Sequence, residues 1–432
     1  MRDWLHGCFS SYCENAPLPG AVYTGTVRIP IMAHKFGVLR RFRFNLPQRI
    51  AAVLLACFLA QGVWLIGHTP LTEADYRMAR CGRETWEQPA ALAGYYTSCG
   101  NPGDGILAYR LAGLPLSLNL LAERGLDHFR QPENRVVLTG DAPPSDWELR
   151  HQLPLISWLL RLPFLAVGCL LGGCLWWVTR RLFGNRGGYA ALALFCFSPA
   201  MLRACTAPNA EALAMLGVYS GLYTCIGVAH AMQGPRRKWR PRIVLLTATL
   251  AVAAGAHSLA LLLTVALGLG FMLWVGEGRR RLILPVALLS TLGALVALFV
   301  FYGFSPDAFR YALAADGLQT RLTLAPARFF FGSVAESGIT LAVAAALALY
   351  AVTRRSRFFG NTVPLLCALV CMVLATASAS PWLWAVPFAL TFVGGVFADA
   401  CEGERARLAI AAGAVIVALQ ALWGLLSLAG LG

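Results

Sequence analysis

Charged side chains are scarce in this sequence of 432 residues, since Asp, Glu, Lys and Arg together make up only 13% of it. That is about half the share of a typical soluble protein. Hydrophobic residues make up 58%, and the mean hydropathy is +0.61. So little polar surface cannot cover two or three soluble domains. The composition predicts an integral membrane protein and excludes a soluble enzyme with one anchor.

The sequence also lacks the motifs of several common binding sites. Its 13 Cys include no Cys-x-x-Cys pair, and most lie in apolar runs, where we interpret them as small core residues. The glycine-rich segment 184–188 has no Lys-Ser or Lys-Thr and is not a nucleotide-binding loop. His257 has no Cys, His or Asp at ligand spacing, so we expect it to bond the backbone. We therefore expect no metal and no cofactor.

The net charge of +15 comes from basic residues whose positions indicate how the chain crosses the membrane. Lys and Arg gather between the hydrophobic runs, as they do in cytoplasmic loops, so no nucleic-acid partner is expected. The first span, 50–67, follows five basic residues with no acidic one among them, which predicts a cytoplasmic tail over 1–48. Residues 1–31 are expected to be a disordered tail or a misassigned start. The polytopic membrane domain is expected to cover 49–432.

A polar stretch, 68–151, follows the first span and holds 11 of the 21 acidic residues. We interpret it as a large first periplasmic loop. Within it, the apolar segment 106–121 is broken by Arg110, Gly113 and Pro115 and is expected to lie as a helix on the membrane surface. Cys81 and Cys99 fall in this loop, where a disulfide between them is predicted.

Basic clusters then mark every second boundary, which places the N-terminus inside and the C-terminus outside. The segment 303–336 is expected to form a second periplasmic loop. The span 189–202 is short and has Pro199 near its end, so we expect it to stop within the outer leaflet and border a cavity. About eleven transmembrane helices are predicted: 50–67, 161–177, 189–202, 210–232, 243–256, 259–275, 282–302, 340–352, 363–377, 383–397 and 408–428.

Glu73 and Asp75 are the leading candidates for a site, because they lie a few residues beyond the first span. If this segment is helical, Glu73, Tyr76 and Arg77 share one face while Asp75 points aside. The alternative interpretation is a solvated acidic turn that caps the next helix.

These residues resemble the Asp-Glu-x-x-Tyr motif of GT-C membrane glycosyltransferases, the superfamily of protein O-mannosyltransferases and bacterial aminoarabinose transferases. The resemblance covers about residues 45 to 232, and the second half of the chain matches only in its hydropathy. Aligned through Glu73 and Tyr76, the position of the family's catalytic Asp holds Thr72, so Glu73 or Asp75 must take that role. Further similar motifs follow in order: Arg161-Leu162-Pro163, Arg180-Arg181-Leu182-Phe183-Gly184, Ser198-Pro199 and Ala207-Pro208-Asn209-Ala210-Glu211-Ala212-Leu213.

The resemblance implies an enzyme that moves a sugar from a polyprenyl-phosphate donor to a lipid, glycan or protein acceptor. It implies a multi-pass protein of the bacterial inner membrane with its site facing the periplasm. Glu73 or Asp75 would act as the catalytic base. The expected substrate-binding residues are Tyr76, Arg77, Arg80, Arg83, Arg110, Arg203, Asn209 and His257, with the Arg residues able to bind phosphate oxygens bidentately.

Three further interpretations remain. A non-catalytic carrier or flippase for lipid-linked glycans is the alternative function, because Thr72 departs from the family motif. Arg203 and Glu211 lie at the outer ends of adjacent spans and are expected to pair. Glu336 begins a span and is expected to be structural, as a carboxylate at a helix N-terminus.

Overall fold

The computed structural model describes residues 45–87, 105–127, 153–304, 306, 330–352, 358–374 and 381–430. The chain divides into residues 1–44 and a unit from Asn45 to Gly432. Most of the predicted cytoplasmic tail, 1–48, lies outside the described residues, and its last three residues belong to α2.

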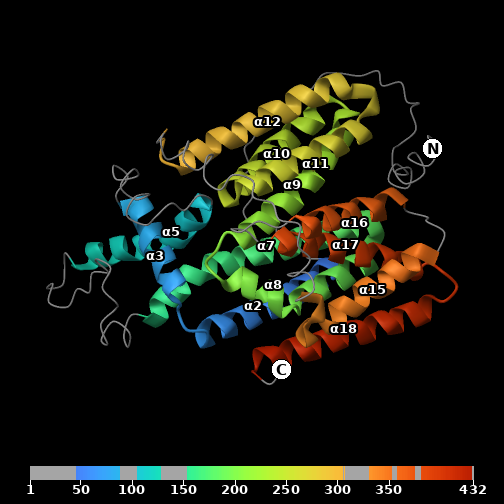
Figure 1. The fold of residues 1–432 in the computed structure, drawn as a ribbon, viewed down its shortest axis with the longest axis horizontal. Helices are drawn as coiled ribbons and strands as arrows, with labels where there is room; N and C mark the ends of the chain where they lie inside the picture. Colours follow the sequence, from blue (N-terminus) through green and yellow to red (C-terminus); the bar gives the residue numbers. More distant parts are fainter. Residues whose placement is uncertain are drawn as a thin grey trace, which may run out of the picture. The chain divides into compact units, whose positions relative to one another are not determined.

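Every regular element of the described ranges is a helix, which confirms the prediction of an all-α integral membrane protein (Figure 1). The helices are α2 (Leu46–His68), α3 (Glu73–Glu87), α5 (Ile106–Asp127), α7 (Leu153–Cys196), α8 (Pro199–Thr206), α9 (Glu211–Met232), α10 (Arg236–Ala256), α11 (Ser258–Val275), η2 (Glu277–Arg279), α12 (Arg280–Phe301), η3 (Val334–Glu336), α15 (Ser337–Val352), α16 (Phe358–Val373), α17 (Pro381–Ala400) and α18 (Ala406–Leu428).

Each of the eleven predicted spans falls on helical segments, but eight helices in the described part of the chain are long and apolar enough to cross a membrane. The difference has three physical sources. The two predicted spans 161–177 and 189–202 lie largely on the two limbs of α7, which follow each other directly and together form one of the eight. The first turns of α10 are strongly basic, and α16 has only 16 residues. The count of eleven crossings therefore stays a prediction.

Gly184 turns α7 back on itself. Its backbone has φ 87° and ψ −178°, in the region that favours glycine, and it separates the helix into two limbs. The turn follows Arg180 and Arg181, where the sequence places a boundary between spans. α7 can therefore leave and return to the same end of the bundle within 44 residues.

The predicted C-terminal end of the span 189–202 is wrong. The second limb of α7 stops at Cys196, and a separate helix of 8 residues, α8, begins at Pro199. Proline is favoured in a first helical turn because it lacks the N–H that would be unpaired there. Ser198 caps the new helix by accepting the Met201 N–H at 3.2 Å.

The core lies around α9 and α17, which pack on each other and on α7. Trp384, Phe388 and Phe392 from α17 and Tyr219 from α9 are all less than 2% exposed. At the periphery, α12 and α18 expose rows of Leu and Val, as expected of helices that face lipid.

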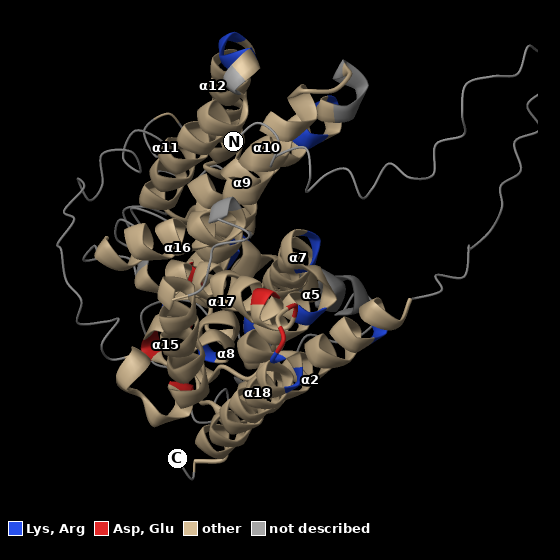
Figure 2. Ribbon diagram, turned by 90° about the vertical axis from the view of Figure 1, so that its right-hand side faces the viewer, with Lys and Arg blue, Asp and Glu red and all other residues tan. Residues whose placement is uncertain are grey.

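Contacts between helix termini define two ends of the bundle. At one, which we call the carboxylate end, α17 begins beside the start of α9, and α18 finishes beside α8. At the other, the basic end, the Arg186 guanidinium donates to Cys401 O and the Gln233 amide donates to Val275 O. Figure 2 shows blue segments at the starts of α10 and α12, which belong to the basic end. The helices alternate between the ends as the charge pattern predicts.

Candidate active site

Thr72 and Asp75 form the cap of α3. The Asp75 carboxylate Oδ2 accepts the Thr72 backbone N–H at 3.0 Å, and the Thr72 hydroxyl accepts the Asp75 N–H at 3.2 Å. This reciprocal pair is a capping box, with Thr72 as the N-cap and Asp75 three residues after it. The interpretation of this turn as a helix cap is thus confirmed for Asp75, although the residue is buried at 8% exposure and not solvated.

Arg161 holds the same carboxylate from the first limb of α7. Its Nη2 lies 2.7 Å from Asp75 Oδ2, and the two side chains are 5% and 11% exposed. The guanidinium also donates to Thr69 O at 2.7 Å, Pro70 O at 2.9 Å and Ser157 Oγ at 3.3 Å. One buried guanidinium therefore joins the α2–α3 connection, α3 and α7.

Arg161 is the residue that sequence reasoning missed. The sequence singles out Arg161-Leu162-Pro163 only as a motif of resemblance. A stronger signal was available, because an Arg within an otherwise apolar span needs a buried partner. Asp75 is that partner.

Glu73 lies on the opposite side of α3 from Asp75. Its side chain is 93% exposed and approaches Arg77 with 3.5 Å between Oε1 and Nη2. The predicted shared face of Glu73 and Arg77 is confirmed, and so is the offset of Asp75, since two helical positions differ by about 200°. It is the offset residue, however, that faces the protein interior.

α3 packs on α5 through two glycines. A Cβ atom at Gly113 would lie 2.0 Å from Gly82 O, so the two helix backbones touch and a larger side chain does not fit. Arg110 reinforces the crossing: its guanidinium lies 5.0 Å from the Trp86 ring centre and donates to Thr85 O at 3.4 Å. The same guanidinium donates to Phe301 O, which anchors α5 on the end of α12.

The other predicted phosphate-binding residues follow along α3. Arg77 is exposed, and Arg80 and Arg83 are half-buried. Burial raises the pKa of Tyr109 on α5, and the nearby Arg77 guanidinium offsets part of that rise. Tyr76 is half-buried. These residues therefore belong to α3 and α5, two helices that pack on each other.

A second group of polar residues surrounds Trp384 at the start of α17. The indole N–H donates to Glu211 Oε2 at 2.9 Å, and the ring lies 5.7 Å from that of His257. His257 is 6% exposed, and its Nδ1 accepts the Leu259 N–H at 3.1 Å. The prediction that His257 bonds the backbone is confirmed, and the bond assigns the ring proton to Nε2. Asn209 Oδ1 accepts the Glu211 N–H at 3.0 Å.

The start of α5 joins this second group to α3. A Cβ atom at Gly105 would lie 3.4 Å from Ala210 Cβ and 3.8 Å from Ala256 O. Gly113, which touches α3, is eight residues further along, or about 12 Å at 1.5 Å per residue. The sequence-predicted residues on α3 and those near His257 therefore lie at one end of the molecule, on either side of α5.

Arg203 and Glu336 lie apart from both groups. The predicted Arg203–Glu211 pair does not form between these described side chains, because Arg203 donates to Ser427 Oγ at 3.4 Å. Glu336 is 2% exposed and accepts hydrogen bonds from the Ser198 hydroxyl at 2.9 Å, the Ala200 N–H at 2.8 Å and the Gln420 amide at 3.3 Å. The predicted structural role of Glu336 is supported. The difference is that Glu336 caps α8, a helix that is far from it in the sequence.

Two predictions concern cysteine and metal sites. Cys81 is disulfide-bonded, but Cys99 lies outside the described residues, so their pairing stays a prediction. The described residues contain no cluster of three or more His, Cys, Asp or Glu suited to a metal ion.

These features define a polytopic α-helical membrane protein with a buried carboxylate–guanidinium pair at one end of the bundle. The comparison with family models finds one match, to the dolichyl-phosphate-mannose-protein mannosyltransferase family, over residues 153–304. The match begins at α7, after the Glu73–Arg83 segment, and continues past residue 232 through α12. It supports a membrane glycosyltransferase of the GT-C type, in line with the resemblance of the motifs. Neither the curated proteins nor the solved structures gave a significant match.

Proposed function

We propose that this protein transfers a sugar from a polyprenyl-phosphate donor to a lipid, glycan or protein acceptor at the carboxylate end. We further propose that this end faces the periplasm from a bacterial inner membrane. The observation that carries the proposal is the buried Asp75 carboxylate, fixed by Arg161 immediately beyond the first span. The family match over α7 to α12 supports the class of reaction.

Asp75 is the proposed catalytic base. The Asp75 carboxylate accepts two hydrogen bonds from the described residues, and both go to Oδ2. This arrangement directs the acceptor hydroxyl to Oδ1. Oδ1 takes the hydroxyl proton while the acceptor oxygen bonds to the anomeric carbon. The bond between that carbon and the phosphate oxygen breaks, and polyprenyl phosphate leaves with the electron pair. A rotamer that is fixed before the substrate binds suits this role.

The leaving phosphate requires cations. Arg80 and Arg83 are the proposed ligands, because they are half-buried and follow Asp75 along α3. Arg77 shares the exposed face with Glu73, so its proposed part is to contact the donor phosphate from that face. Arg110 already binds α3 and α12, so its proposed part is to hold α3 in place. Tyr76, Asn209 and His257 are proposed to contact the donor or acceptor from the two sides of α5, and Arg203 to bind lipid phosphate nearby.

The decisive comparison is Asp75→Asn against Glu73→Gln, assayed in membranes with a prenyl-phosphate sugar. Asp75→Asn is expected to lower kcat, measured per folded molecule, by at least about 100-fold, the scale for losing a general base, with KM little changed. Glu73→Gln is the matched control, because its exposed carboxylate contacts only Arg77 in the described structure. The reverse pattern would make Glu73 the base.

Full activity in both variants would remove the α3 segment from catalysis. The alternative, a carrier or flippase for lipid-linked glycans, would then lead. One observation favours it: Thr72, at the position of the family's catalytic Asp, is used to cap α3. Analysis of lipids from a deletion strain separates the two functions. Loss of one sugar modification indicates transfer, whereas accumulation of a complete lipid-linked glycan indicates flipping.

A further inference from the structure

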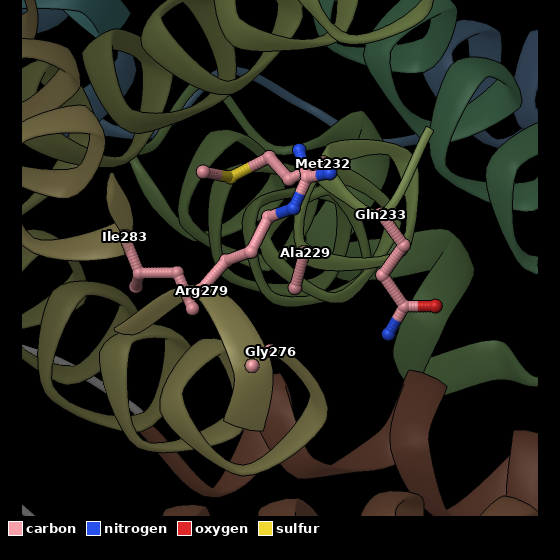
Figure 3. A pocket seen from close by; sticks show the side chains of 7 residues that line it. Ala229, Met232, Gln233, Gly276, Arg279 and Ile283 are labelled. Carbon is pink, nitrogen blue, oxygen red and sulfur yellow. The ribbon is translucent and has the colours of Figure 1, made fainter. Parts of the chain in front are cut away.

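A pocket of about 260 Å³ opens at the basic end, far along the sequence from the proposed base. It lies between the last turn of α9, the turn after α11 and the first turn of α12. Figure 3 shows Ile283 on one side, Gln233 on the other, and the Arg279 side chain extending toward Met232. The pocket thus has an apolar floor and two nitrogen-bearing side chains.

The surrounding aromatic residues place this pocket at the depth of lipid headgroups. Trp274, which is 47% exposed, lies five residues before Arg279. On α7, the Arg181 guanidinium lies 5.3 Å from the ring centre of Trp177, which is 55% exposed. Exposed Trp beside Arg is typical of the boundary between hydrocarbon and water. From Ser258 to Trp274, α11 rises about 24 Å, close to the thickness of a bilayer core.

The electrostatics of the pocket select an anion. Arg279 is exposed, and its guanidinium has no hydrogen bond or ion pair with any residue that the structure describes. Gln233 uses one amide N–H for Val275 O at 3.3 Å. The second N–H and the guanidinium can both donate to phosphate oxygens. Arg280 and Arg281 follow directly and are exposed, which adds to the positive potential.

The apolar surroundings select a lipid over a soluble anion. Met232, Ala229 and Ile283 line the pocket. Just beyond it, α12 exposes Leu284, Leu288 and Leu292 at 54%, 61% and 47%, a row at helical spacing along which an acyl chain can lie. The volume is below the roughly 300–1,000 Å³ of sites for drug-sized ligands. It suits a phosphate and part of its glycerol.

We propose that this pocket binds the phosphate of an anionic phospholipid from the leaflet at the basic end. The proposal is independent of the glycosyltransferase function.

The test is thermal unfolding of the purified full chain in an uncharged detergent and phosphate-free buffer, with added phosphatidylglycerol. The wild type is expected to gain stability with lipid concentration, as a ligand specific to the folded state requires. Arg279→Gln is expected to raise the apparent Kd by about tenfold or more, since it removes a charge-assisted bond. Arg407→Gln, an exposed arginine of the same end outside the pocket, is the matched control and should match the wild type.

Met232→Trp fills the pocket without changing its charge and is expected to weaken binding as well. It carries the test if Arg279→Gln fails to fold. Equal lipid affinity in the wild type, Arg279→Gln and Met232→Trp would overturn the proposal. Saturation by glycerol 3-phosphate alone would also overturn it, by identifying a site for a soluble phosphate.

Discussion

The two ends of the bundle use arginine in opposite ways. At the carboxylate end, Arg161 is 4% exposed and donates to four acceptors on three elements. At the basic end, Arg279, Arg280, Arg281 and Arg407 are all exposed. A buried guanidinium must have its N–H groups paired, whereas one at the membrane surface is satisfied by water and lipid phosphate. Burial thus separates the arginine that pairs with Asp75 from the arginines of the basic end.

The largest expected effect breaks the buried pair. Arg161→Ala leaves the Asp75 carboxylate buried without its cation, and we expect a loss of about 3–5 kcal/mol in unfolding free energy. The measurement is chemical unfolding of the purified protein in detergent.

The double variant Asp75→Asn/Arg161→Ala should recover part of this loss, because it removes the unpaired charge. The contrary result is a double variant that is less stable than Arg161→Ala by the full amount that Asp75→Asn costs on its own. The two side chains would then be energetically independent, and the pair would not fix α3.

The next largest effect on stability is expected for Glu336→Ala. It leaves the Ser198 hydroxyl, the Ala200 N–H and one Gln420 N–H without their acceptor in the interior. We expect a loss of about 3 kcal/mol in unfolding free energy. Glu336→Gln keeps one acceptor oxygen and should lose less. Glu404→Ala, on an exposed turn, should leave the melting temperature unchanged. Equal melting temperatures for the two alanine variants would show that Glu336 does not hold α8.

Much of the fold could be predicted from the sequence, because apolar runs and arginine clusters report local and periodic properties. The alternation of helices between the ends is an example. The split at Pro199 was harder, because Ser198 and Glu336 are 138 residues apart and together cap α8. A capping partner from a distant helix leaves no local pattern.

The candidate site was less predictable for a related reason. Helical geometry correctly separated Glu73 from Asp75, but the sequence left open which of the two carboxylates is the base. The choice depends on which face meets α7. Asp75 meets α7 through Arg161, which is 86 residues away in the sequence. The contact of α5 with α3 at Gly82 likewise depends on tertiary packing.

A smaller effect is expected where α3 crosses α5. Gly113→Ala would bring a methyl group against Gly82 O, so the helices must move apart, at a cost of about 1–3 kcal/mol. Because α3 carries the proposed base, we expect the rate of sugar transfer to fall even where the protein remains folded. Gly270→Ala is the matched control, since a Cβ there meets open space. Transfer in Gly113→Ala equal to that in Gly270→Ala would mean that the crossing does not position the site.

The smallest effect is expected at the basic end. Arg407→Gln removes an exposed charge on the first turn of α18, and we expect its unfolding free energy to stay within about 0.5 kcal/mol of the wild type. Its orientation should also persist, because the other arginines of this end still retain it. Cysteine labelling of intact and permeabilised cells, with single probes at Asp127 and Arg237, measures orientation, and the probe at Arg237 should label only after permeabilisation. A loss of stability comparable to that of Arg161→Ala would contradict the contrast between the ends, since an exposed arginine would then be as tightly held as a buried one.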